Sequence, residues 1–274
     1  MRRLVPLVIA LFSLANAFSA SMSLDVEKEK KSFGTEITIS PMDKTVTVTK
    51  NKIVIKPASE NVTYTISGYF NGQIVNKTKN TILKLKNAYL ENTSGEPAIY
   101  GDAKTEISTT KGTSNYVVSS GQAKSGAKVS AIECRKNLVL GGSGILSVKG
   151  TLYHAVKADD VKIKGSGLFF FEATDKGSCI NCHSLAVEKD KTFAAYFLNS
   201  KNAVKADNTI LIQSGDFFIY DNATAFKTDT KKDDPKNPHF VTLSGGTIRL
   251  RGNKSVCETE KDSYKVNGAA LIEE

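Results

Sequence analysis

A five-residue motif occurs six times at nearly constant spacing, and this repeat constrains the fold more than any other feature of the sequence. In each copy the second residue is large and apolar, the fourth is small, and the third and fifth are mostly polar. The steps between successive copies are 33, 24, 24, 24 and 22 residues. A period in the twenties indicates a solenoid, in which each repeat packs only against its neighbours. The copies begin at Ala98, Ala131, Ala155, Cys179, Ala203 and Ala225.

The segments between the motifs alternate apolar and polar residues with a period of two, which is typical of half-buried strands. Glycine-rich turns follow the same beat, as in 140–146, 163–169, 212–218 and 243–249. A coil of roughly 24 residues holds about three strands of average length and their turns. The sequence therefore predicts an all-β parallel β-helix with coils of about 22–25 residues. Its inward side chains would stack ~4.8 Å apart in columns. The long step contains an insertion that we place at 112–126.

The first 20 residues have the pattern of a secretory signal peptide. Arg2 and Arg3 precede an apolar stretch that is too short to span a bilayer, and small residues follow it. Residues 21–44 are polar and suggest a tail or an N-terminal cap, and the β-helix would occupy residues 45–274. We therefore expect a secreted or extracellular protein, with the periplasm or a cell surface as alternatives, and no membrane span.

The chain carries a formal charge of +9, or +7 after removal of the two signal-peptide arginines. The excess is mostly lysine spread along the sequence, whereas a nucleic-acid binder more often concentrates arginine on one element. We therefore expect no nucleic-acid partner. A basic chain suits an acidic ligand through long-range attraction.

The stretch from Asn80 to Leu250 resembles the secreted carbohydrate-binding domain-containing family of microbial proteins. The resemblance rests on segments 82–92, 95–100, 110–115, 138–148 and 155–163. It implies a right-handed, single-stranded parallel β-helix similar to polysaccharide lyases. It also implies binding of cellulose or of acidic, pectin-like glycans, with calcium sites in some members. Arg135 and His183 interrupt an otherwise Asp column, which puts a stacked calcium site in doubt.

Four carboxylates on this column and beside it are the candidate metal ligands. Calcium is the hard cation that such oxygens prefer. The alternative is that lysines of the neighbouring column (Lys157, Lys205, Lys227) neutralise them in cross-strand pairs. The candidates are Asp159, Asp160, Asp207 and Asp229.

Cys179, Cys182 and His183 form a C-x-x-C-H sequence, the attachment pattern of c-type haem. Haem is disfavoured because both cysteines replace alanines of the repeat and a second axial ligand is lacking. Cys134 would lie two coils from Cys182, ~9.6 Å by strand spacing. This distance is too long for the two cysteines to share a zinc ion or to form a disulfide. A Cys179–Cys182 bridge and free buried thiols both stay open. The three histidines, including His154, are most simply surface residues.

Aromatic residues supply the candidate ligand-binding surface. Runs such as 169–171 and 217–220 alternate between the two faces of a strand, so one set packs in the core. The other set would form an exposed ladder suited to the apolar faces of sugar rings, although edge protection is a common alternative. The ladder residues are Phe170, Tyr196, Phe218 and Tyr220.

Three functions follow from these features. The first is a secreted, non-catalytic polysaccharide-binding protein. The second is a calcium-dependent polysaccharide lyase on the same scaffold, with Arg135, Lys157 or Lys205 as its base. The third is a surface or adhesin protein without affinity for sugars. A shared scaffold does not distinguish them.

Overall fold

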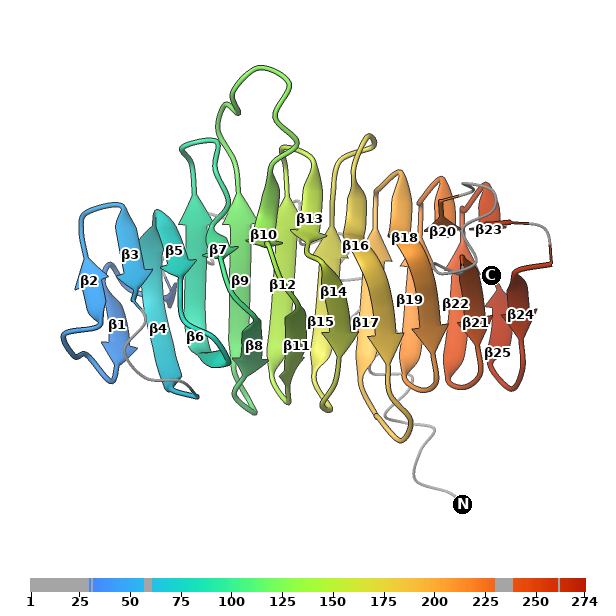
Figure 1. Ribbon diagram of the computed structural model, residues 1–274, viewed down its shortest axis with the longest axis horizontal. Coiled ribbons are helices and arrows are strands. Elements are labelled where there is room, and N and C mark those ends of the chain that lie inside the picture. The colour runs from blue at the N-terminus through green and yellow to red at the C-terminus, as the bar shows by residue number, and fades with distance from the viewer. Residues whose placement is uncertain (1–29, 31, 57–60, 230–238, 261) are drawn as a thin grey trace.

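The computed structural model describes residues 30, 32–56, 61–229, 239–260 and 262–274. The described residues form 25 β-strands and almost no helix, which confirms the all-β prediction. No helix in these ranges is long and apolar enough to cross a membrane. Figure 1 shows the strands lying side by side along one long axis, from blue at the N-terminal end to red at the C-terminal end.

The strands fall into three columns of hydrogen-bonded neighbours, which we call sheets 1, 2 and 3. Sheet 1 contains β3 (Lys52–Ile55), β5 (Gln73–Asn76), β7 (Ile99–Gly101), β10 (Ser130–Cys134), β13 (His154–Lys157), the first halves of β16 (Ser178–Val187) and β18 (Asn202–Ile212), β20 (Thr224–Thr228) and β23 (Ser255–Glu258). Sheet 2 contains the first halves of β4 (Thr63–Asn71) and β6 (Thr81–Asn92), β8 (Thr105–Thr109), β11 (Leu138–Gly142), β14 (Asp160–Ile163), the second halves of β16 and β18, β21 (Phe240–Leu243) and β24 (Tyr264–Val266).

Sheet 3 contains the second halves of β4 and β6, β9 (Ser114–Ser119), β12 (Ile145–Gly150), β15 (Leu168–Glu172), β17 (Ala194–Leu198), β19 (Asp216–Tyr220), β22 (Thr247–Arg251) and β25 (Ala270–Glu273). All pairings within the three sheets are parallel. Two antiparallel pairs lie at the N-terminal end, where β1 (Ile37–Ser40) pairs with β4 and β2 (Val46–Val48) pairs with β3. The chain passes through sheets 1, 2 and 3 in turn, and we call each such passage a rung. This arrangement is consistent with a β-helix-like solenoid.

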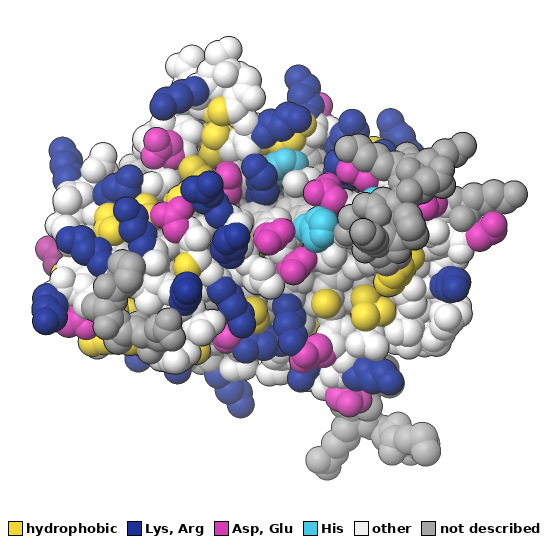
Figure 2. Space-filling view, in the orientation of Figure 1, with side chains coloured by type: hydrophobic (Ala, Val, Ile, Leu, Met, Phe, Trp, Pro, Cys, Tyr) yellow, Lys and Arg dark blue, Asp and Glu magenta, His cyan; other side chains and the backbone are white. Residues whose placement is uncertain are grey.

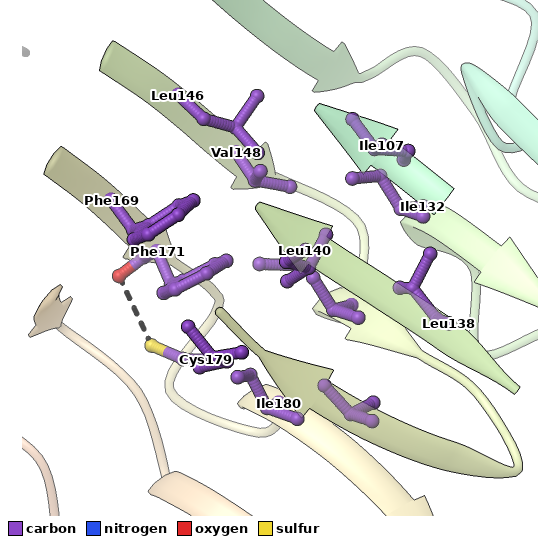
Figure 3. Close-up of a cluster of buried hydrophobic side chains, with 14 of the residues drawn as sticks. Ile107, Ile132, Leu138, Leu140, Leu146, Val148, Phe169, Phe171, Cys179 and Ile180 are labelled. Atoms are coloured by element: carbon purple, nitrogen blue, oxygen red, sulfur yellow. Dashed lines mark hydrogen bonds between the residues drawn. The ribbon is translucent and has the colours of Figure 1, made fainter. Parts of the chain in front are cut away.

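The second position of the five-residue motif forms an inward column, as the repeat predicts. Val156 pairs with Ile180 and Ile180 with Val204, and none of the three side chains is exposed. Figure 3 shows how the core fills from all three sheets, with Phe169 and Phe171 of β15 beside Cys179 and Ile180 of β16. Full burial of each such side chain contributes roughly 1.5–3 kcal/mol.

Glycine-rich turns between sheets 2 and 3 stack on one another along the solenoid. Gly142 and Gly165 have φ values of +100° and +95°, which residues with a side chain rarely adopt. A Cβ added to Gly165 would lie 2.3 Å from the Gly142 carbonyl oxygen. The periodic glycines are therefore required by close backbone contact between rungs.

The extra residues of the long step lie later than predicted. Residues 114–119 form β9, a regular strand of sheet 3 with inward Asn115 and Val117. The insertion is the loop of residues 120–129, which projects above β9 and β10 in Figure 1. The prediction of 112–126 was wrong at its start, because Ser114 and Ser119 occupy the two ends of strand β9.

Candidate functional site

A column of polar side chains runs along the outer face of sheet 1, at the third position of the repeated motif. Register places Glu133, Lys157, Asn181, Lys205, Lys227 and Glu258 on successive rungs. The two glutamates lie at the ends of this stretch, and lysines and an asparagine lie between them. The outward direction follows from strand alternation, because positions two and four of the motif fill the core.

This column forms one wall of a groove of 360 Å³. The groove extends over five rungs, from the rung of β10 to the rung of β20. The other wall comes from the turn that precedes each sheet 1 strand. Of the eleven described residues that line it, six are lysines and none is acidic, and we call the site the lysine groove. Its lysines are Lys128, Lys157, Lys176, Lys201, Lys205 and Lys227.

Three of these lysines have carboxylate partners. Lys157 lies 3.6 Å from Glu133, Lys205 lies 3.3 Å from Asp229, and Lys227 pairs with Glu258. Hydrogen bonds from Lys227 and Thr224 lower the pKa of Glu258, so this carboxylate stays ionised. Such partly exposed pairs contribute little to stability.

The other three lysines line the opposite wall of the groove. Among the described residues, no ion pair joins a carboxylate to Lys128, Lys176 or Lys201. All three side chains are exposed. The Lys128 ammonium lies 5.4 Å from the centre of the Tyr153 ring, within cation–π range. The groove therefore offers three ammonium groups that form no ion pair with a described carboxylate, although Lys201 helps to lower the pKa of Glu258.

His154 lies on the floor of the groove. Only 6% of it is exposed, so the expectation that it is a surface residue was wrong. Its Nδ1 accepts a hydrogen bond from the Ser178 N–H at 3.0 Å. Burial, and then the charges of Lys157 and other lysines, lower the pKa of His154 to about 4. The imidazole is therefore neutral at physiological pH, and the field of the lysines reaches the floor of the groove.

Figure 2 shows how charge is distributed over one face of the molecule. Lys and Arg side chains are spread over this face, with Asp and Glu between them. The lysine groove differs from this mixed surface because, in the part of the chain that the structure describes, no carboxylate lines it.

The predicted aromatic ladder lies on the outer face of sheet 3. Register places Phe170, Tyr196 and Phe218 on successive rungs. The Phe170 and Tyr196 ring centres are 4.8 Å apart and nearly parallel, and those of Tyr196 and Phe218 are 4.3 Å apart. The same outer column begins with Tyr69, Tyr89 and Tyr116, with Ser147 between the two sets. We call it the aromatic column.

The rings of the aromatic column are not exposed. Phe170 and Tyr196 are each 3% exposed and Phe218 is half-buried. Because the rings stack on one another, their flat faces, which a sugar ring would contact, are already covered. The Arg249 guanidinium adds a further cover, 5.8 Å from the centre of the Phe218 ring. Burial, followed by the charge of Asp216, raises the pKa of Tyr196 to about 12.

Tyr220 belongs to the neighbouring outer column and is also covered. The Arg251 guanidinium lies 4.2 Å from its ring centre, and its hydroxyl lies 3.1 Å from a Glu274 carboxylate oxygen. It is 5% exposed. Ligand binding by Phe170, Tyr196, Phe218 and Tyr220 stays a prediction, and such binding requires that the rings be uncovered first.

The start of the described chain lies on the other half of the aromatic column. The Phe33 ring packs edge-on against Tyr89 and Tyr116, with centres 5.6 Å away in each case. Lys30 pairs with Glu91 at 2.9 Å. Outward aromatic residues of sheet 3 therefore serve in part to hold this segment.

The four candidate metal ligands do not form a cluster in the structure. In the ranges that the structure describes, no three His, Cys, Asp or Glu side chains are grouped so as to hold a metal ion. Asp229 pairs with Lys205, and Asp160 accepts a hydrogen bond from Asn137 at 3.3 Å. Asp160 and Asp207 both lie near enough to Cys182 to raise its pKa, after burial. Calcium binding at Asp159, Asp160, Asp207 and Asp229 is untested.

The four cysteines are free thiols. Cys179 and Cys182 point into the core in the columns of the repeat alanines and are 0% and 2% exposed. The Cys179 thiol lies 3.2 Å from the Phe171 carbonyl oxygen (Figure 3). His183 is half-buried on the outer face, and its Nε2 lies 2.9 Å from the Asn208 amide nitrogen. The C-x-x-C-H sequence therefore does not bring its three side chains together around one open pocket.

Sequence reasoning identified the lysine column but not the groove. Lys157, Lys205 and Lys227 share the third motif position, so their alignment follows from the repeat. Lys128 and Lys176 are separated by 48 residues, twice the 24-residue step. This spacing is the signal that places them on one wall.

The chain is similar to known proteins in sequence and in fold. The sequence model of a family described as "carbohydrate-binding domain-containing protein" matches residues 42–194, more than half of the chain. Among solved structures, the polysaccharide lyase-like protein from C. thermocellum, determined as a gadolinium derivative, has a similar fold with a TM-score of 0.53. The two chains are 17% identical, and the alignment covers 85% of this chain and 89% of that one. No curated protein sequence matches the chain.

Proposed function

Because the chain belongs to the carbohydrate-binding domain-containing protein family, we propose that it is a secreted protein that binds a linear polysaccharide without cleaving it. Its scaffold is a right-handed, single-stranded parallel β-helix with coils of about 22–25 residues. The ligand is cellulose or an acidic, pectin-like glycan. Residues 1–20, which lie outside the described residues, act as a signal peptide that is removed on export.

One observation carries this proposal. The lysine groove runs across five consecutive rungs and repeats similar side chains at the rung spacing of ~4.8 Å. A surface that repeats along one direction suits a polymer of repeating units better than a compact metabolite. Small-molecule sites, by contrast, are concave and mostly apolar.

A polysaccharide screen tests the proposal directly. The protein of residues 21–274 is mixed with insoluble cellulose, pectin and neutral control glycans, with and without a calcium chelator. We expect retention by at least one plant-type polysaccharide and no release of new reducing ends. Failure to bind any glycan in the panel would refute the proposal and favour a surface protein without sugar affinity.

A calcium-dependent lyase is the second candidate. It is favoured by the lysines of the lysine groove, which could serve as a base. Release of unsaturated uronides from polygalacturonate gives an ultraviolet absorbance that appears with calcium and disappears with chelator. If no absorbance appears on any uronate polymer, the lyase assignment is refuted.

A further inference from the structure

We infer that the lysine groove is the binding site for an anionic glycan, whose carboxylate or sulfate groups contact the lysines on both of its walls. The inference rests on the proposed function and specifies its ligand class and its site. None of these lysines belongs to the aromatic column or to the four candidate metal ligands.

The first argument is the balance of charge. Six lysines and no carboxylate of the described residues line the groove. Of the three carboxylates that pair with its lysines, Glu133 and Glu258 lie at the two ends of the outer column, and Asp229 pairs with Lys205. Inside the groove, Lys128, Lys176 and Lys201 form no ion pair with a carboxylate among the described residues, although Lys201 lies near enough to Glu258 to help lower its pKa. A cleft lined by one sign of charge concentrates its field and attracts counter-ions.

The second argument comes from the floor of the groove. His154 is buried there, and Lys157, Lys128 and Lys205 each lower its pKa, after burial. Three lysines from different rungs therefore act at one point. Placing an anion above His154 would relieve this field, so the histidine reports on ligand occupancy.

The third argument is spacing. Lys205 and Lys227 lie on adjacent rungs, ~4.8 Å apart along the solenoid, and Lys157 lies two rungs from Lys205. A linear glycan with one charge on successive sugar units presents anions along its length in a similar way. Asn181, half-buried between Lys157 and Lys205, supplies an amide for the sugar hydroxyls.

The side-chain types favour a glycan over a nucleic acid. The described lining of the groove contains lysines and no arginine, whereas arginine is the usual residue for bidentate phosphate and base recognition. Binding of single-stranded nucleic acid also relies on aromatic rings that stack with the bases. Among the described residues, the groove has two aromatic rings, the buried imidazole of His154 and the Tyr153 ring, against which Lys128 lies.

Charge reversal on the unpaired wall tests the inference. The double variant Lys176→Glu/Lys201→Glu changes two exposed lysines that form no ion pair among the described residues. The matched control is Lys111→Glu/Lys189→Glu, which makes the same change in net charge at exposed turns between sheets 2 and 3. Circular dichroism and thermal unfolding confirm that all proteins are folded.

Titration calorimetry measures binding of polygalacturonate as the carboxylate glycan, dextran sulfate as the sulfated glycan and soluble cello-oligosaccharide as the neutral one. We expect the groove variant to lose roughly tenfold or more in affinity for the anionic glycan, or ~1.4 kcal/mol, while the control changes much less. The stronger of the two anionic ligands identifies the anionic group. Increasing salt weakens binding, because screening acts on these exposed charges. A calcium chelator leaves the affinity unchanged.

Several outcomes would overturn the inference. Equal losses in the two variants would show that net charge acts without a site. Unchanged glycan binding by the groove variant would show that the groove is not the binding site, and the proposed function would stand. A wild-type protein that binds no glycan would refute the proposed function itself. Loss of binding on chelation would replace lysine contact with a calcium bridge. Tighter binding of a single-stranded oligonucleotide than of any glycan would also overturn it.

Discussion

The buried histidine under the lysine groove predicts a pH-dependent loss of stability. Its pKa is about 4 in the folded protein and 6.5 as the ordinary value. Because the folded-state pKa is the lower one, the unfolded chain binds the proton more readily between these values. The stability contribution of neutral His154 is therefore complete above about pH 6.5 and decreases as the pH falls towards 4. The free energy of unfolding at pH 4 is therefore about 3 kcal/mol lower than above pH 6.5 on account of this one group.

The variant His154→Asn separates this effect from the titration of carboxylates. Asparagine is not ionisable and keeps a side-chain acceptor for the Ser178 N–H. It also fits the column, since Asn202 holds the equivalent position two rungs further on. Urea unfolding at pH 7, 6, 5 and 4 should show that the wild type loses about 3 kcal/mol more than the variant over this range.

Parallel pH profiles of the two proteins would refute the reasoning. If the variant fails to fold, nuclear magnetic resonance of the wild-type imidazole provides the same test. We expect His154 to remain neutral down to about pH 5, and a midpoint near 6.5 would show that burial does not shift its pKa.

Further predictions concern the core, the turns, the thiols and the last rung. The Phe197 ring is fully buried and stacks on two neighbours, so Phe197→Ala should lower the free energy of unfolding by about 3–5 kcal/mol. Phe218 is half-buried, and Phe218→Ala should lower it by less. Equal losses would contradict the assignment of inner and outer columns. Gly150→Ala should cost more than a typical surface change, because its Cβ would lie 1.7 Å from a carbonyl oxygen, and a neutral effect on thermal unfolding would contradict this close contact. Burial raises the pKa of every cysteine, so Ellman's reagent at pH 8 should react slowly with the native protein. The first thiol to react should be that of half-buried Cys257. Fast reaction of all four thiols would contradict the packing. Leu271 is 38% exposed although it continues an inward column. Amide hydrogens around it should therefore exchange before those of the central rungs. Uniform protection would indicate that another surface covers this end.

The interior of this protein could be predicted closely because it depends on two short-range rules. Strand alternation selects which residues point inward, and the repeat length selects which residues pair between rungs. Val156, Ile180 and Val204 follow both rules, so their register was readable without coordinates. The position of the insertion was misjudged because serine and asparagine are compatible with both a loop and the inner face of a strand.

The outer surface depended on information that neither rule contains. Alternation assigned Phe170 and Tyr196 correctly to the outside of sheet 3, but their exposure depends on how the rings stack and on what else covers the sheet. His154 gave no local sign of burial, because the column it shares with Ser178 and Asn202 is polar although it is buried. Lys128 and Lys176 each precede a copy of the motif by three residues, and the turn before each sheet 1 strand places them opposite the lysine column. Periodicity thus specified the direction in which each side chain points, whereas the curvature of the chain between strands decided which outward side chains meet.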